Sequence, residues 1–188
     1  MTTAVNRGDR GRRPPRPLDE ARLHELALAY VARFATSGAQ LERYLKRKLR
    51  ERGWDGAREP DLAAVVVRLV ELRYVDDAAY AAMRSGSLLR RGYGPRRVAQ
   101  ALGQAGIAED LREEVRPDDA DQRRAGLALA RKRRFGPFGA GPPDRPTREK
   151  QIAAMLRAGH RLDTAREIVD AASVAAAEDW AAQAEDES

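Results

Sequence analysis

The chain has 188 residues and no cysteine, which excludes disulfide frameworks, thiol catalysis and cysteine metal sites. It carries 35 Lys and Arg against 29 Asp and Glu, a formal net charge of +6 that favours an anionic partner. Only 5% of the residues are aromatic, as is typical of small helical units. No apolar run reaches the roughly 20 residues that span a bilayer. We therefore expect a cytoplasmic protein without membrane association.

Both ends of the chain are expected to lie outside the folded body. Residues 1–17 are basic, rich in Pro and Gly and almost without apolar side chains, which predicts a disordered basic arm and no secretory signal. Residues 178–188 carry five acids and no base, which predicts a short acidic tail.

The first predicted unit covers residues 18–75. Asp19 is expected to cap its first helix, and the capping-box pattern at Ser37 predicts the start of a second helix. That helix is predicted to end at Gly53 with a positive φ angle. A third helix is predicted to start near Pro60, which suits a first-turn position. The apolar stripe of the first helix consists of Leu23, Leu26, Ala27, Tyr30 and Phe34.

The second predicted unit covers residues 76–117. Its first helix is expected to start at Asp76, because acidic side chains favour helix amino ends. Pro95 suits the first turn of its second helix, which is predicted to end at Gly106. A short third helix is expected over residues 108–115.

The third predicted unit covers residues 118–177. A helix over 119–134 is followed by a loop rich in Gly and Pro. Thr147 is expected to cap the next helix, Gly159 ends it, and the last helix is predicted to run from about Asp163.

The glycines that end the three middle helices recur with a regular period, since Gly53, Gly106 and Gly159 fall 53 residues apart. An apolar anchor stands four residues before each glycine, a bulky residue follows it, and a cap starts each helix. The anchors are Leu49, Leu102 and Met155, the following residues are Trp54, Ile107 and His160, and the caps are Ser37, Gly94 and Thr147. The period predicts an all-α fold of three tandem three-helix repeats that stack in an elongated, curved array.

Catalytic patterns are sparse. We interpret the two histidines, His24 and His160, as structural or exposed, and the acidic pair Asp76–Asp77 as a helix cap. No phosphate loop, zinc motif or nucleophile elbow is present. We therefore expect no catalytic residue, no metal, no cofactor and no enzymatic activity.

Every unit carries a basic cluster. The candidate binding residues are Arg43, Lys46, Arg47 and Arg50 in the first unit, Arg90, Arg91, Tyr93, Arg96 and Arg97 in the second, and Arg131, Lys132, Arg133, Arg134, Lys150 and Arg157 in the third. Any single cluster can be interpreted as a solvated helix face. Their recurrence favours an extended cationic surface that binds single- and double-stranded DNA with salt-sensitive affinity and little sequence preference.

Four segments resemble a known family. Residues 43–54 (RYLKRKLRERGW) are similar to the first-repeat helix of the RecX regulatory proteins, and residues 72–81 (LRYVDDAAYA) to that family's link between repeats. Residues 90–98 (RRGYGPRRV) resemble its basic R-x-G-Y/F-G-P-x-R/K-I motif, and residues 102–107 follow in register. The resemblance covers about residues 18–174.

The resemblance implies a function. Members of this family have tandem three-helix repeats, bind the RecA recombinase filament on DNA, and modulate, usually inhibit, its ATPase, strand-exchange and coprotease activities. It therefore implies a role in DNA repair, homologous recombination and the SOS response, with no catalytic site of the protein's own, and we expect a monomer. The chain departs from the pattern in its loop over 138–146, in His160 at a position that is commonly aromatic, and in its basic arm.

Two other hypotheses remain open. A stand-alone helix-turn-helix regulator would read sequence on duplex DNA with one recognition helix and usually a dimer interface. The spread of basic residues over three units favours tracking along DNA over reading its sequence. An enzyme that acts on nucleic acid would need clustered carboxylates or a metal site.

Overall fold

The fold was analysed in a computed structural model that describes residues 16–186. The described part is helical and contains no strand, which confirms the predicted all-α class. Its elements are α1 (Glu20–Val31), α2 (Gly38–Arg52), α3 (Leu62–Glu71), α4 (Asp77–Arg90), α5 (Pro95–Ala105), α6 (Glu109–Glu114), α7 (Asp119–Arg133), the 3-10 turn η1 (Gly136–Phe138), α8 (Arg145–Arg157), α9 (Leu162–Asp170) and α10 (Val174–Asp186).

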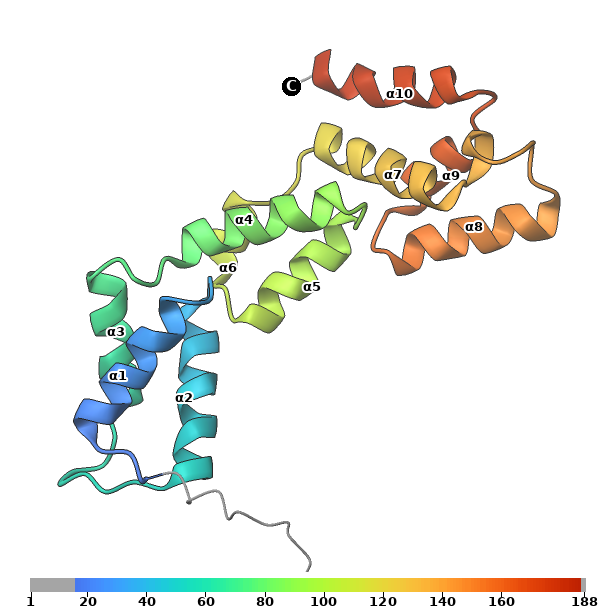
Figure 1. The fold of residues 1–188 in the computed structure, drawn as a ribbon. Coiled ribbons are helices and arrows are strands. Elements are labelled where there is room, and N and C mark those ends of the chain that lie inside the picture. Colours follow the sequence, from blue (N-terminus) through green and yellow to red (C-terminus); the bar gives the residue numbers. More distant parts are fainter. Residues whose placement is uncertain (1–15, 187–188) are drawn as a thin grey trace, which may run out of the picture.

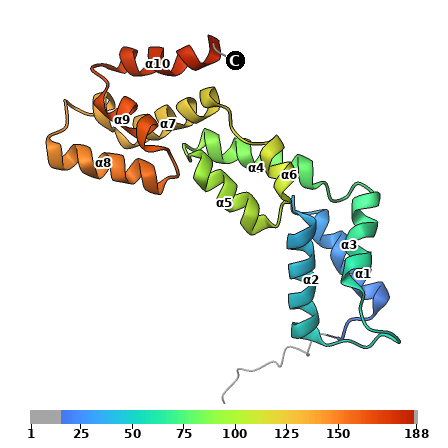
Figure 2. The same ribbon diagram turned by 180° about the vertical axis from the view of Figure 1, so that it is seen from behind.

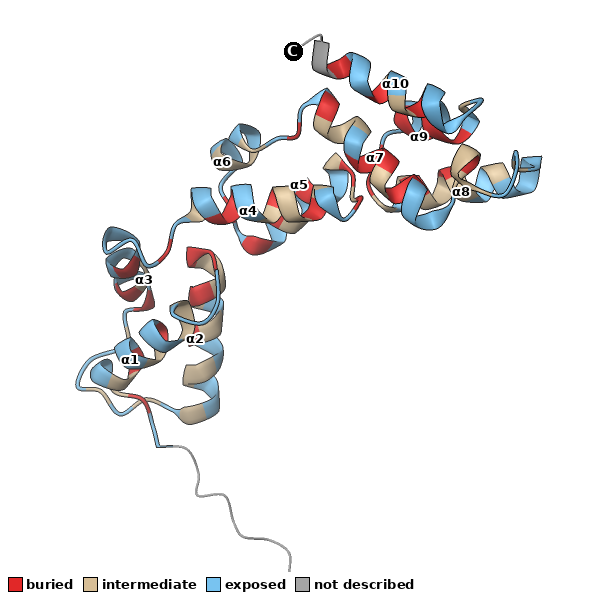
Figure 3. Ribbon diagram, turned by 45° about the horizontal axis from the view of Figure 1, so that its top comes forward, coloured by how far each residue is buried: buried red, intermediate tan, exposed pale blue. Residues whose placement is uncertain are grey.

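The helices form three groups along an elongated, curved chain (Figures 1 and 2). Each group has its own apolar core: one among α1–α3, one among α4–α6 and one among α7–α10. In Figure 3 the buried residues lie on the helix faces that turn toward neighbours within each group. The predicted anchors Leu102 and Met155 are buried in the second and third cores, and Leu49 packs half-buried against the first.

Most predicted helix starts agree with the structure. The carboxylates of Asp19, Asp76 and Asp118 accept hydrogen bonds from the third residue of their helices. Ser37 forms the complete capping box with Gln40. These side chains satisfy N–H groups that the first helical turn leaves without intrahelical partners.

Two helix starts differ from the prediction. Asp61 caps α3, so Pro60 precedes the cap instead of occupying the first turn. Asp144 caps α8, and its carboxylate accepts the backbone N–H of Thr147, which was expected to be the cap itself. The hydrogen bonds from Thr147 hold the pKa of Asp144 below its ordinary value. An aspartate at either position outcompetes its neighbour because its oxygen reaches the N–H group three residues ahead.

The two ends of the chain were predicted to be unstructured. Residues 1–15 of the predicted basic arm lie outside the described residues. The carboxyl end differs from the prediction, because the expected acidic tail is helical as far as Asp186 in α10. Helix α10 packs on α7 through Ala177, Ala181 and Ala184, which are buried at spacings of four and three residues. The third repeat therefore has a fourth helix.

The middle helices α2, α5 and α8 lie end to end (Figure 1). The hydroxyl of Ser37, at the start of α2, donates a 2.6 Å hydrogen bond to the carbonyl oxygen of Ala105 at the end of α5. The N–H of Gly94, at the start of α5, donates a 2.9 Å bond to the carbonyl oxygen of Ala158 at the end of α8. Each joint thus satisfies a carbonyl group at the carboxyl end of one helix and brings that end to the amino end of the next.

The glycine period follows from these joints. The φ angles of Gly53, Gly106 and Gly159 are 80°, 77° and 97°, which confirms the positive φ angle predicted for Gly53. Gly106 adopts the left-handed helical conformation, whereas Gly53, with ψ of 174°, does not. A Cβ atom on Gly106 would lie 2.4 Å from Cβ of Ala39, and one on Gly159 would lie 2.5 Å from the backbone nitrogen of Arg97. Gly53, at the outer end of α2, has no such neighbour within 4 Å. Two of the three glycines are therefore required by close packing between repeats as well as by their φ angles.

Candidate nucleic-acid and partner interface

Five predicted binding residues meet in one pocket of about 340 Å³ between the second and third repeats. We call it the basic pocket, and these members are Arg91, Tyr93, Lys132, Arg133 and Arg157. Its four cations stand at the carboxyl ends of α4, α7 and α8. A helix carboxyl end carries partial negative charge and favours cations, so the convergence of three such ends lets four cations share one site.

The positive charge of the basic pocket is not compensated nearby. No carboxylate is among the residues that line it, and no ion pair involves its four cations in the described part of the chain. The guanidinium carbon of Arg91 lies 5.5 Å from the ring centroid of Tyr93, which supports the cation on one side. The four cations are exposed, whereas Tyr93 is half-buried. Such a site can bind phosphate or carboxylate oxygens through charge-assisted hydrogen bonds.

The glycines of the segment 90–98 serve the joint. A Cβ atom on Gly92 would lie 2.8 Å from the backbone nitrogen of Leu129, and one on Gly94 would lie 2.4 Å from the carbonyl carbon of Gly159. Neither position has room for a side chain. The close approach of α7 and α8 to this turn is what brings Tyr93 into the basic pocket.

The structure does not gather the candidate arginines of this segment around Tyr93. Only Arg91 lies over Tyr93. Arg90 lines a separate groove that also contains Glu114 and Asp121, and Arg96 lines a third groove that contains glutamates. Arg97 donates a hydrogen bond to the side chain of Gln100. Their part in binding stays a prediction, but the structure separates them from the basic pocket.

The remaining candidates of the third repeat also lie apart. Arg131 forms an ion pair with Glu178 of α10 and lies 5.7 Å from the ring centroid of Phe138, so it faces the extra helix. Arg134 ends α7 in a left-handed conformation with φ of 57°. Lys150 is exposed on α8.

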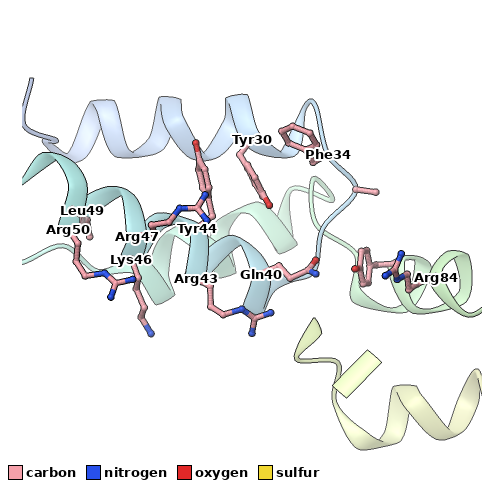
Figure 4. Close-up of a pocket in the computed structure, with 12 residues that line it drawn as sticks. Tyr30, Phe34, Gln40, Arg43, Tyr44, Lys46, Arg47, Leu49, Arg50 and Arg84 are labelled. Atoms are coloured by element: carbon pink, nitrogen blue, oxygen red, sulfur yellow. The ribbon is translucent and has the colours of Figure 1, made fainter. Parts of the chain in front are cut away.

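A second cationic site lies in the first repeat. The predicted cations Arg43, Lys46, Arg47 and Arg50 line one side of a groove of about 1000 Å³, which we call the aromatic groove (Figure 4). Its other members include Tyr30, Phe34, Tyr44 and Arg84. The sequence did not identify these four as binding residues, since Tyr30 and Phe34 fit the spacing of a core stripe. The signal that could have found Phe34 is its position three residues before the capping box, beyond the end of α1.

His160 belongs to the joint and not to a catalytic group. Its side chain is fully buried, and Nε2 lies 3.0 Å from the carbonyl oxygen of Gly92. Burial lowers the pKa of His160, and the hydrogen bond to Gly92 opposes that shift. The imidazole is therefore favoured in its neutral form. This agrees with the interpretation of His160 as a structural residue.

The described residues offer neither a metal-binding cluster nor a membrane-spanning helix. No group of three or more His, Cys, Asp or Glu side chains in residues 16–186 is arranged to hold a metal ion. None of the helices in that range combines the length and apolar character needed to cross a membrane.

Comparisons with known proteins identify relatives of the chain. The family profile described as RecX, second three-helix domain, matches residues 76–115. The chain is 32% identical over 171 residues to the regulatory protein RecX of Myxococcus xanthus, covering 86% of this chain and 91% of that protein. It is 37% identical over 139 residues to the regulatory protein RecX of Halorhodospira halophila, covering 73% of this chain and 80% of the other.

The fold has a solved counterpart. The crystal structure of RecX from Lactobacillus salivarius superposes with a TM-score of 0.62 at 21% identity, over 80% of this chain and 96% of the other. The identity to these relatives confirms the resemblance of segments 43–54, 72–81 and 90–98 to the family. This chain belongs to the RecX family of regulatory proteins.

Proposed function

We propose that this protein binds the filament that the RecA recombinase forms on DNA and lowers its ATPase, strand-exchange and coprotease activities. The partner follows from membership of the RecX family, whose known action on that filament the sequence resemblance implies. The direction of the effect is our inference from the usual behaviour of the family.

The observation that carries the proposal is the basic pocket. Four cations without a carboxylate neighbour stand at the joint of two repeats that backbone hydrogen bonds connect. The aromatic groove adds a second group of cations in the first repeat. An elongated protein with cationic sites on separate repeats can contact more than one subunit or phosphate of a filament at once, and the linked contacts reinforce one another. Bridging of this kind would hinder the rearrangement of neighbouring RecA subunits.

The helix-turn-helix alternative finds less support. In that motif the amino-terminal residues of the recognition helix contact base edges in the major groove. Here the amino ends of α2 and α5 are covered by the next repeat at the two joints. The exposed cations favour contacts with phosphates, which carry little sequence information.

Binding to RecA filaments assembled on immobilised single-stranded DNA tests the proposal. We expect the wild-type protein to bind, and the triple variant Lys132→Ala, Arg133→Ala and Arg157→Ala to bind at least about tenfold more weakly, because charge-assisted contacts are lost. The control variant changes the net charge by the same amount elsewhere, through Arg68→Ala, Arg116→Ala and Arg145→Ala. These three exposed arginines pair with glutamates three or four residues away in the sequence.

Each outcome is informative. Equal weakening in the two triple variants would mean that only net charge matters and would contradict the role of the basic pocket. Absence of wild-type binding to RecA filaments would contradict the proposed function itself.

A further inference from the structure

Three aromatic side chains lie side by side in the aromatic groove (Figure 4). The rings of Tyr30 and Tyr44 are stacked, with centroids 4.0 Å apart and planes that differ by 16°. The ring of Phe34 lies 5.3 Å from that of Tyr30, tilted by 45°. Phe34 is 51% exposed, which is unusual for a phenylalanine beside an apolar core. The stack thus ends in an aromatic ring that is open to solvent.

Cations line the same groove as these rings. Five line the groove, and no carboxylate does: Arg43, Lys46, Arg47, Arg50 and Arg84. The guanidinium of Arg43 donates a 2.9 Å hydrogen bond to the carbonyl oxygen of Gln104, a neutral acceptor that fixes its position but leaves its charge uncompensated. Arg50 and Arg84 form no ion pair within the described residues. Positive charge therefore faces the groove from α2 and from α4 of the next repeat.

We propose that the aromatic groove binds single-stranded DNA, with one unpaired base stacked on Phe34 and the neighbouring phosphates held by Arg43, Arg50 and Arg84. Every base has a π-face, so stacking on an aromatic ring is tolerant of sequence, and a cationic groove beside it follows the backbone. Duplex DNA has no free base face to offer. An acidic peptide could use the cations, but only its aromatic residues, if it had any, could stack on Phe34, whereas every nucleotide carries a flat base.

This inference rests on the part of the proposed function that concerns DNA, and it requires no recombinase. It assigns different tasks to the two kinds of side chain. Phe34 recognises the presence of a base, whereas the arginines recognise the charge of the backbone. A base-containing strand and an abasic strand of equal length separate these tasks, because they carry the same phosphates.

The test is fluorescence anisotropy with labelled oligothymidylate and with the matched abasic strand. The wild-type protein is expected to bind oligothymidylate more tightly. Phe34→Ala should weaken binding of oligothymidylate about tenfold and leave the abasic affinity unchanged. The double variant Arg50→Ala and Arg84→Ala should weaken binding of both strands. Tyr74→Ala is the matched control, since Tyr74 is an exposed aromatic residue (57%) that does not line the groove.

Phe34→Leu provides a second variant that keeps an apolar side chain but lacks a planar face, and it should behave as Phe34→Ala does. Equal wild-type affinity for the two strands would overturn the inference, because binding would then depend on charge alone. The inference would also be overturned if Phe34→Leu bound oligothymidylate as tightly as the wild-type protein does. A protein that binds bases through Phe34 but has no affinity for RecA filaments would keep the inference and refute the proposed function.

Discussion

The imidazole Nε2 of His160 lies 3.0 Å from the carbonyl oxygen of Gly92, and this contact connects the third repeat to the second. Because a carbonyl oxygen can only accept a hydrogen bond, Nε2 carries the ring proton in the neutral imidazole. Nδ1 is buried and has no hydrogen-bond partner within the described residues. His160 therefore acts as a packing element with one polar contact that closes the joint.

Replacement of His160 by alanine should destabilise the protein. His160→Ala leaves a cavity and removes the partner of a buried carbonyl group, and we expect a loss of about 2–5 kcal/mol in the free energy of unfolding. Urea denaturation followed by circular dichroism measures this loss. His24→Ala is the control, because His24 is exposed on α1 and its replacement should change stability by less than about 0.5 kcal/mol. Equal stability of the two variants would contradict the role of the contact.

The same residue predicts a pH dependence. The unfolded chain protonates this imidazole near the ordinary value of 6.5, whereas burial lowers the pKa in the folded protein. As the pH falls below 6.5, the unfolded state binds more protons, so the folded state loses stability by at most about 1.4 kcal/mol per pH unit from this group. His160→Phe should remove that component while the carboxylates contribute as before. Denaturation curves at several pH values for both proteins test the difference, and identical slopes would show that His160 does not contribute.

The repeat glycines predict a graded response to substitution. Gly53→Ala should cost about 1–3 kcal/mol, since φ of 80° and ψ of 174° are adopted almost only by glycine, but the space around the position is open. Gly106→Ala should cost clearly more, because the added methyl group would also collide with Ala39 at the joint. Chemical denaturation of the two variants compares them directly. If they lost equal stability, the joint between α2 and α5 would be less tightly packed than described.

Helix α10 is tested by a matched pair of alanines. Ala181 is buried against α7, whereas Ala182 is exposed. Ala181→Glu should destabilise the protein by about 2–4 kcal/mol, because a charged side chain would be forced into the core, and Ala182→Glu should have little effect. Thermal unfolding of both variants gives the answer. A frayed acidic tail would tolerate both substitutions equally.

Features set by local chemistry were predictable from the sequence. The capping box at Ser37 and the helix ends at Gly53, Gly106 and Gly159 depend on a few consecutive residues, and the structure has them as expected. The glycine period also indicated the number of repeats. Helix α10 was missed because its buried face consists of alanines, whose small side chains give little hydrophobic periodicity beside acidic neighbours.

The sites depend on contacts that no local pattern encodes. The basic pocket arises because the carboxyl ends of α4, α7 and α8 converge, and that convergence requires the joint at Gly94 and Gly159. The same convergence explains why Lys132 and Arg157 meet while Arg90 and Arg97 do not. The stack of Tyr30 on Tyr44 joins two helices, and the exposure of Phe34 follows from the end of α1 at Val31.

The rate of ATP hydrolysis by RecA on single-stranded DNA, measured while this protein is titrated in, tests the central claim most directly. We predict a decrease in the rate that grows with the ratio of this protein to RecA, and a weaker decrease for the triple variant of the basic pocket. A rate that stayed constant over the whole titration, under conditions in which RecA filaments form, would contradict the proposed function.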